Sequence, residues 1–267
     1  MVRRATVDGC KMCNALENVK MGNRNKSVVV TQTSQLWEKA TRRDFMRLMG
    51  IGGAIVLAPS ILASCSDDSD DMTGPGSGST VTIDFSKGDI AVLQFAYALE
   101  QLEADFYTRV AANFGSSGLS AAEQTIFGDI KNHEVIHRDA FKTVLGASNG
   151  FTLTPVYGGV NFSSRDSILG TSKTFEDLGV AAYNGAAQYL SDTTNLLIAG
   201  KIVSVEARHA SAIADLIAPK TSGFAPQAFD NAFSPGKVKD AAQGFITEKL
   251  AFAGNPPAFV QGPNGNG

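Results

Sequence analysis

The feature of this sequence that most limits its fold is a short motif that occurs twice. Glu134 and His137 are separated by two residues, and Glu206 and His209 repeat the same spacing. Residues three apart lie on one face of a helix. A single pair of this kind would be no more than a solvated surface pair. The chain has only three histidines, however, and two of them fall into the repeat. The repeat therefore indicates two related helices that present the same chemistry.

Two further glutamates extend the repeat to the segments that precede these motifs. Glu100 lies in "EQLEADFY" and Glu176 in "EDLGVAAY", and each stands seven residues before a tyrosine, Tyr107 or Tyr183. The two glutamates precede the glutamates of the Glu-x-x-His motifs by 34 and 30 residues. Each half is thus a segment with Glu followed by a segment with Glu-x-x-His, as expected for an internal duplication.

Four segments have the apolar periodicity of helices, at about 89–113, 120–146, 173–190 and 194–217. Asp89 is expected to cap the first, and "SAAE" at 120–123 has the form of a capping box for the second. The inward stripe of the fourth is predicted to include Leu197 and Ile202. About 26 residues, 147–172, separate the second helix from the third, with "TLTPVYGGVNF" at most a short hairpin. Such a long connection favours a crossover between the two ends of a four-helix bundle.

The four glutamates lie on the apolar stripes of these helices. Glu100, for example, has Ala96 one turn before it and Ala104 one turn after it. Burying four carboxylates without compensation is unfavourable, because each buried ion costs several kcal/mol. Two divalent cations would balance four carboxylates, and neutral imidazoles would add ligands without charge. The alternative is a core that holds protonated carboxyl groups and no metal.

On these residues the chain resembles the ferritin-like di-iron and di-manganese carboxylate proteins. In that class, one Glu from each of two helices joins a Glu-x-x-His from each of the other two. In particular the chain resembles the ferritin-like-domain group that includes plant desiccation-related proteins and many exported bacterial proteins. The resemblance covers about residues 89–218 and implies an all-α, ferritin-like four-helix bundle with a long crossover between helices 2 and 3. The implied metal ligands are Glu100, Glu134, His137, Glu176, Glu206 and His209.

The resemblance also implies roles for these ligands. Glu134 and Glu206 would bridge two metal ions, Glu100 and Glu176 would be terminal ligands, and each motif histidine would bind one ion. A mixed set of oxygen and nitrogen ligands suits Fe or Mn better than structural Zn, which favours thiolate and imidazole. The expected cofactors are therefore two divalent ions of Fe or Mn.

Several neighbours of the ligands are open to more than one interpretation. Glu103, whose counterpart in the repeat is Gly179, is a further carboxylate near the metals, a group behind the ligands, or a helix-surface residue. Tyr107 and Tyr183 pack in the core, and each could hydrogen-bond a ligand carboxylate. His133 is expected at the surface or behind a ligand rather than at a metal.

A carboxylate-bridged metal pair can bind O₂ or peroxide and exchange two electrons. The leading hypothesis is a di-metal oxidase, either a ferroxidase or a catalase-like enzyme, with O₂, peroxide or Fe²⁺ as substrates. Small residues in the third helix, such as Gly179 and Gly185, either leave space for an oxidant or permit close helix packing. The alternative hypothesis is a non-catalytic, metal-stabilised module for binding or for protection under stress or desiccation. A closed storage cage is not expected, because an anchor and a tail on each subunit fit poorly with a closed shell, whereas a smaller homo-oligomer is compatible with the sequence.

The N-terminal segment differs in charge from the rest of the chain. Residues 1–64 hold ten Lys or Arg and four Asp or Glu, whereas the remainder holds 13 basic and 22 acidic residues. So acidic a body argues against a nucleic-acid partner. "TRRDFMR", from residue 41, resembles the twin-arginine consensus, and "LASC", ending at Cys65, resembles a lipobox. We expect an exported periplasmic or cell-surface lipoprotein anchored in the membrane through Cys65; the alternative is an ordinary signal or signal-anchor with an incidental cysteine.

These patterns divide the chain into four parts. Residues 1–64 are the N-terminal extension and signal, and residues 65–88 form an acidic, Gly/Ser-rich tether that is expected to be disordered. Residues 89–218 form the bundle, and 219–267 form a tail with one helix at about 235–252. Cys10 and Cys13 form a C-x-x-C without a partner motif, and we expect them to be removed with the signal or to reflect a start at Met21.

Overall fold

The computed structural model describes residues 79–256 and 258–260. The predicted export signal, Cys65 and the acidic segment that follows it lie outside the described residues. Within the described ranges, no helix combines the length and the apolarity that crossing a bilayer requires.

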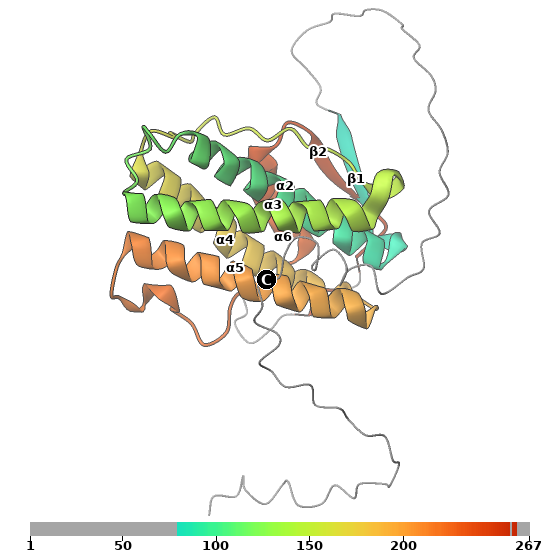
Figure 1. Ribbon diagram of the computed structural model, residues 1–267. Helices are drawn as coiled ribbons and strands as arrows, with labels where there is room; N and C mark the ends of the chain where they lie inside the picture. Colours follow the sequence, from blue (N-terminus) through green and yellow to red (C-terminus); the bar gives the residue numbers. More distant parts are fainter. Residues whose placement is uncertain (1–78, 257, 261–267) are drawn as a thin grey trace, which may run out of the picture. The chain divides into compact units, whose positions relative to one another are not determined.

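Four long helices dominate the described part of the chain. They are α2 (Asp89–Ala112), α3 (Ala121–Asn149), α4 (Arg165–Ala186) and α5 (Thr193–Ile217). Short connections join α2 to α3 and α4 to α5, so each of these pairs is antiparallel. The connection 150–164 runs back along the bundle from the end of α3 to the start of α4 (Figure 1). The predicted all-α bundle with a crossover between its second and third helices is confirmed.

The boundaries of α3 follow local signals. The Ser120 side chain accepts a hydrogen bond from the Glu123 backbone N–H, and the Glu123 carboxylate accepts one from the Ser120 N–H. The predicted capping box is therefore present. Near the other end, Gly146 has a φ of 61° and interrupts the helical backbone before a last turn to Asn149. Glycine reaches this left-handed region without the penalty that a Cβ imposes.

The predicted start of α4 was wrong by eight residues, because the helix begins at Arg165. Ser164 caps it, since its side chain accepts a hydrogen bond from the Ser167 N–H. Ile168 and Leu169 in the first turns are buried in the core. The Gly- and Ser-rich composition just before this point hid the cap.

Two further details of the helices differ from the predictions. Asp89 is the first residue of α2 rather than its cap, and its carboxylate accepts hydrogen bonds from the N–H groups of Ser191 and Asp192 before α5. Leu197 is 68% exposed rather than inward. It stands five residues before the buried Ile202, which places it on the opposite side of α5 at 3.6 residues per turn.

The C-terminal segment is not one long helix as predicted. α6 spans only Pro235–Ala242, and a strand, β2 (Lys249–Ala253), follows it. β2 pairs in parallel with β1 (Thr80–Asp84), which lies in the segment predicted to be a disordered tether. The tether prediction was wrong for this end, because Ile83 is fully buried against the bundle. The segment 152–162, expected to be at most a hairpin, instead forms a single bridge between Pro155 and Ile246.

These additions cover one side of the bundle. Figure 1 shows α3 and α5 in front, with α6 and the two strands behind α2 and α4. Ile83 of β1, Val238 of α6 and Leu250 of β2 share one apolar cluster with Phe95 of α2. The crossover is fixed to α2 as well, because the Tyr157 hydroxyl donates to the carbonyl oxygen of Leu102. The middle of α2 and α4 is therefore far from solvent.

Candidate metal centre

All six predicted ligands converge in the middle of the bundle. The four glutamates have no exposed surface, and the two histidines are 5–6% exposed. Their oxygen and nitrogen atoms form two groups, and within each group these atoms lie within 4.8 Å of one another. Glu134 and Glu206 belong to both groups. The first group adds Glu100 and His137, and the second adds Glu176 and His209.

The first group surrounds the imidazole of His137. Its Nδ1 lies 3.0 Å from Glu206 Oε1, 3.4 Å from Glu134 Oε2 and 3.5 Å from Glu100 Oε2. None of these contacts has hydrogen-bond geometry, since His137 Nδ1 is without a hydrogen-bond partner. Three carboxylates from α2, α3 and α5 thus face one nitrogen.

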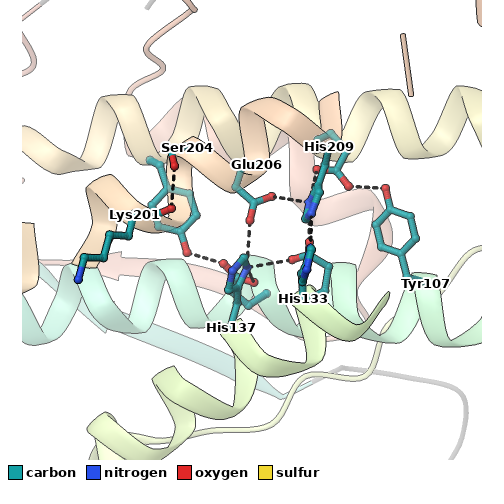
Figure 2. A network of polar contacts seen from close by, with 11 residues as sticks. Tyr107, His133, His137, Lys201, Ser204, Glu206 and His209 are labelled. Carbon is teal, nitrogen blue, oxygen red and sulfur yellow. Dashed lines mark hydrogen bonds and ion pairs between the residues drawn. The ribbon is translucent and has the colours of Figure 1, made fainter. Parts of the chain in front are cut away.

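The second group repeats this arrangement around His209. Its Nδ1 lies 2.9 Å from Glu134 Oε1, 3.4 Å from Glu176 Oε2 and 3.7 Å from Glu206 Oε2. Glu134 and Glu206 therefore direct one oxygen toward each histidine. Figure 2 shows Glu206 between the two imidazoles, with contacts to both. This is the arrangement expected of two carboxylates shared by neighbouring positions.

The two tyrosines hold the remaining glutamates. The Tyr107 hydroxyl on α2 donates to Oε1 of Glu176 on α4, and the Tyr183 hydroxyl on α4 donates to Oε1 of Glu100 on α2. Each tyrosine therefore fixes the glutamate of the other half and leaves its Oε2 facing the centre. The expected hydrogen bond from each tyrosine to a glutamate carboxylate is confirmed. The sequence spacing did not reveal that each tyrosine contacts the glutamate of the other half of the bundle.

Nine buried side-chain atoms in the described part of the chain lack a hydrogen-bond partner. Buried polar groups are normally paired, so such a concentration needs an explanation. All nine belong to the six predicted ligands and to one neighbour: Oε2 of Glu100, Glu103 and Glu176, both oxygens of Glu134 and Glu206, and Nδ1 of His137 and His209. Carboxylate oxygens and imidazole nitrogens directed at common points are a donor set that could hold metal ions.

Residues 88–219 match the model of the ferritin-like domain family. This segment is a ferritin-like domain. The matched range is nearly the same as the bundle predicted over 89–218, and it excludes β1, α6 and β2. No curated protein matches the chain.

Burial and mutual contacts shift the pKa values in the ferritin-like domain. Burial, the largest influence, raises the pKa of Glu100 and of Glu176 to about 8. Burial acts in the same direction on Glu134, but its contacts with the two motif histidines outweigh burial and lower its pKa to about 2. Burial lowers the pKa of His209, yet the carboxylates around it raise that pKa to about 12, and His137 shifts upward in the same way. Without metal, bound protons therefore offset the carboxylate charge.

His133, the third histidine, stands behind one ligand rather than at the centre. Its Nδ1 lies 2.9 Å from His209 Nε2, and the two rings are parallel within 9° with centroids 5.2 Å apart. Figure 2 shows His133 beside His209. His209 thus faces the carboxylates with Nδ1 and His133 with Nε2. Among the described residues, His137 has no comparable partner on its second nitrogen.

Two glycines of α4, Gly179 and Gly185, were predicted either to leave space for an oxidant or to permit close helix packing. A Cβ added to Gly185 would lie 1.8 Å from the carbonyl oxygen of Phe233, so this glycine permits close packing of the segment before α6. A Cβ added to Gly179 would lie 3.1 Å from Glu103 Oε1. Glu103 is 4% exposed, so the interpretation of a helix-surface residue was wrong.

Proposed function

We propose that the ferritin-like domain binds two divalent metal ions, Fe or Mn. The observation that carries this proposal is the sharing of Glu134 and Glu206 by two groups of buried ligand atoms that have no hydrogen-bond partners. Glu100 and His137 would complete one position. Glu176 and His209 would complete the other. The ferritin-like family and the chemistry of these donors support the same assignment.

When bound, a carboxylate-bridged Fe or Mn pair supplies two-electron chemistry with O₂ or peroxide. The chain supplies the rest. Tyr107 and Tyr183 orient the terminal carboxylates, and the apolar residues around them exclude bulk water. An apolar pocket of about 30 Å³, lined by residues of all four long helices, reaches Tyr183 and has room for little more than a small molecule. We propose oxidation of Fe²⁺ or removal of peroxide as the activity.

The activity is tested with Fe- or Mn-loaded protein. Consumption of Fe²⁺ with O₂, or of peroxide, is measured beside a Glu134→Ala variant loaded in the same way. We expect turnover by the wild type and none by the variant, because both metal positions lose a ligand. Absence of turnover with either substrate in protein that holds two ions would contradict the enzymatic proposal.

A second candidate is a non-catalytic module that the metal ions stabilise. The complete burial of the four ligand glutamates favours it, because it restricts access to the centre. A ligand that binds only the folded state stabilises it by about 4 kcal/mol at 1,000 times its Kd. A large rise in Tm on metal addition without reaction with an oxidant would favour this candidate over an enzyme.

We also propose that the protein is exported and anchored through Cys65. The twin-arginine-like "TRRDFMR", the apolar run after it and the lipobox-like "LASC" support this placement. Cys65→Ser should move the full-length protein from the membrane fraction to the soluble fraction of its host. An unchanged distribution, together with no lipid mass on the N-terminal peptide of the wild type, would contradict the anchor.

A further inference from the structure

Glu103 is a buried carboxylate that the six-residue ligand pattern does not use. It lies on α2, one turn after Glu100, and is 4% exposed. Its Oε2 has no hydrogen-bond partner, a property it shares with the six predicted ligands. A buried carboxylate ion left unpaired costs several kcal/mol, so Glu103 either holds a proton or needs a cation that the described residues do not provide.

Glu103 approaches the centre from the side where α2 faces α4. A Cβ built on Gly179 would lie 3.1 Å from Glu103 Oε1 and 3.7 Å from Glu206 Oε2. The carboxylates of Glu103 and Glu206 therefore lie against the same point of α4. A small apolar pocket of about 10 Å³, lined by Glu103, Gly179 and Ala242 of α6, lies on this side. Both motif histidines come instead from α3 and α5.

The duplication explains why only one such carboxylate is present. Because Glu100 corresponds to Glu176, Glu103 corresponds to Gly179. One half supplies the carboxylate, and the other half supplies the space that the carboxylate occupies. A side chain at Gly179 would displace Glu103, since 3.1 Å is tighter than an ordinary van der Waals contact.

The charge of Glu103 affects which oxidation state of a metal pair the centre would favour. Four ligand carboxylates balance two divalent ions, and Glu103 adds a fifth negative charge once it has lost its proton. We propose that Glu103 is a fifth carboxylate of the metal centre and that it favours a metal pair with a total charge above +4, which contains at least one trivalent ion. This inference rests on the proposed function, because it requires that the pair binds.

The test compares the iron-loaded wild type with Glu103→Gln, which keeps the side-chain shape and removes the charge. The midpoint potential of the Fe³⁺/Fe²⁺ couple is measured by potentiometric titration, together with iron content and Fe²⁺ affinity. We expect the variant to retain two ions and its midpoint potential to shift to a more positive value, because the oxidised pair loses a compensating charge. Loss of one ion from the variant would also support a place at the centre.

Two further variants make the result specific. Glu248→Gln removes a buried carboxylate that binds Thr154 away from the centre, and it should leave the potential unchanged. Gly179→Ala keeps every charge but displaces Glu103, and it should alter the absorption spectrum of the oxidised pair.

The outcomes separate this inference from the proposed function. If the wild type holds two ions and Glu103→Gln has the same iron content, Fe²⁺ affinity and midpoint potential, the inference on Glu103 is overturned while the metal centre stands. If the wild type binds no iron or manganese, both are overturned.

Discussion

The two halves of the bundle agree at the predicted ligands and differ just beside them. The half formed by α2 and α3 and the half formed by α4 and α5 each carry a Glu, a Tyr seven residues later and a Glu-x-x-His. The first half adds Glu103 and His133, where the second half has Gly179 and Val205. The repeated residues define two equivalent groups of candidate ligand atoms. The residues that are not repeated make those positions unequal, and each difference can be tested.

The largest effect is expected from the carboxylates that both halves share. Glu206→Ala removes a ligand from both positions and should abolish binding of both ions, whereas Glu176→Ala should remove one. Metal content per chain, measured by elemental analysis after loading and desalting, checks this. Asp177→Ala, beside Glu176 but half-exposed, is the matched control and should retain both ions. Retention of two ions by Glu206→Ala would contradict the bridging role.

A change in pH should alter the metal affinity of both halves in the same way. The raised pKa values of Glu100 and Glu176, both about 8, and of the two motif histidines mean that the metal-free centre holds protons at neutral pH. Binding must displace them, so affinity should rise with pH from 6 to 8, by about tenfold per pH unit for each proton released. Calorimetric titrations in buffers of different ionisation enthalpy count those protons. An affinity independent of pH would show that the ligands are already deprotonated.

His133 should distinguish the two positions. A partner on the second nitrogen of a metal-binding histidine orients the ring, and its removal typically costs 10–100-fold in affinity. His133→Ala should therefore weaken one of two binding steps by about that factor, because its contact is with His209 and not with His137. Val205 is the counterpart of His133 in the other half, and Val205→Ala should alter neither binding step. Equal weakening of both steps would show that His133 acts on the fold rather than on one position.

The tyrosines should give the smallest and most symmetric effect. Tyr107→Phe and Tyr183→Phe each remove one donor from a buried terminal carboxylate. Leaving a buried acceptor without its partner costs about 1–3 kcal/mol, and we expect a similar decrease in the free energy of unfolding for both variants. Urea denaturation of the metal-free proteins measures it. A clear difference between the two would mean that the halves are less equivalent than their contacts indicate.

The bundle and the convergence of the six candidate ligands could be predicted because both depend on local patterns. Apolar periodicity places helices, and the duplicated Glu-x-x-His identifies which faces meet. The parallel pairing of Thr80 with Lys249 could not be predicted in this way, because strands so far apart in sequence leave no local signal of their partnership. The same reason explains why the end of the tether and the C-terminal tail were assigned wrongly.

The parts of the site that escaped prediction depend on contacts between the halves. The spacing of Tyr107 and Tyr183 suggested a contact with a carboxylate, but only the packing of α2 against α4 shows that each reaches the other half. Glu103 was ambiguous because its burial depends on the space beside Gly179, a residue on a different helix. A glycine at the counterpart position of a glutamate was the signal available in the sequence.

The central claim is that buried carboxylates and imidazoles from the two halves hold a pair of metal ions. It is tested most directly by elemental analysis of the purified, folded protein, before and after incubation with Fe²⁺ and with Mn²⁺. The account predicts two ions of Fe or Mn per chain. A protein that shows the helical signature of the bundle and yet binds fewer than one ion per chain under both conditions would contradict it.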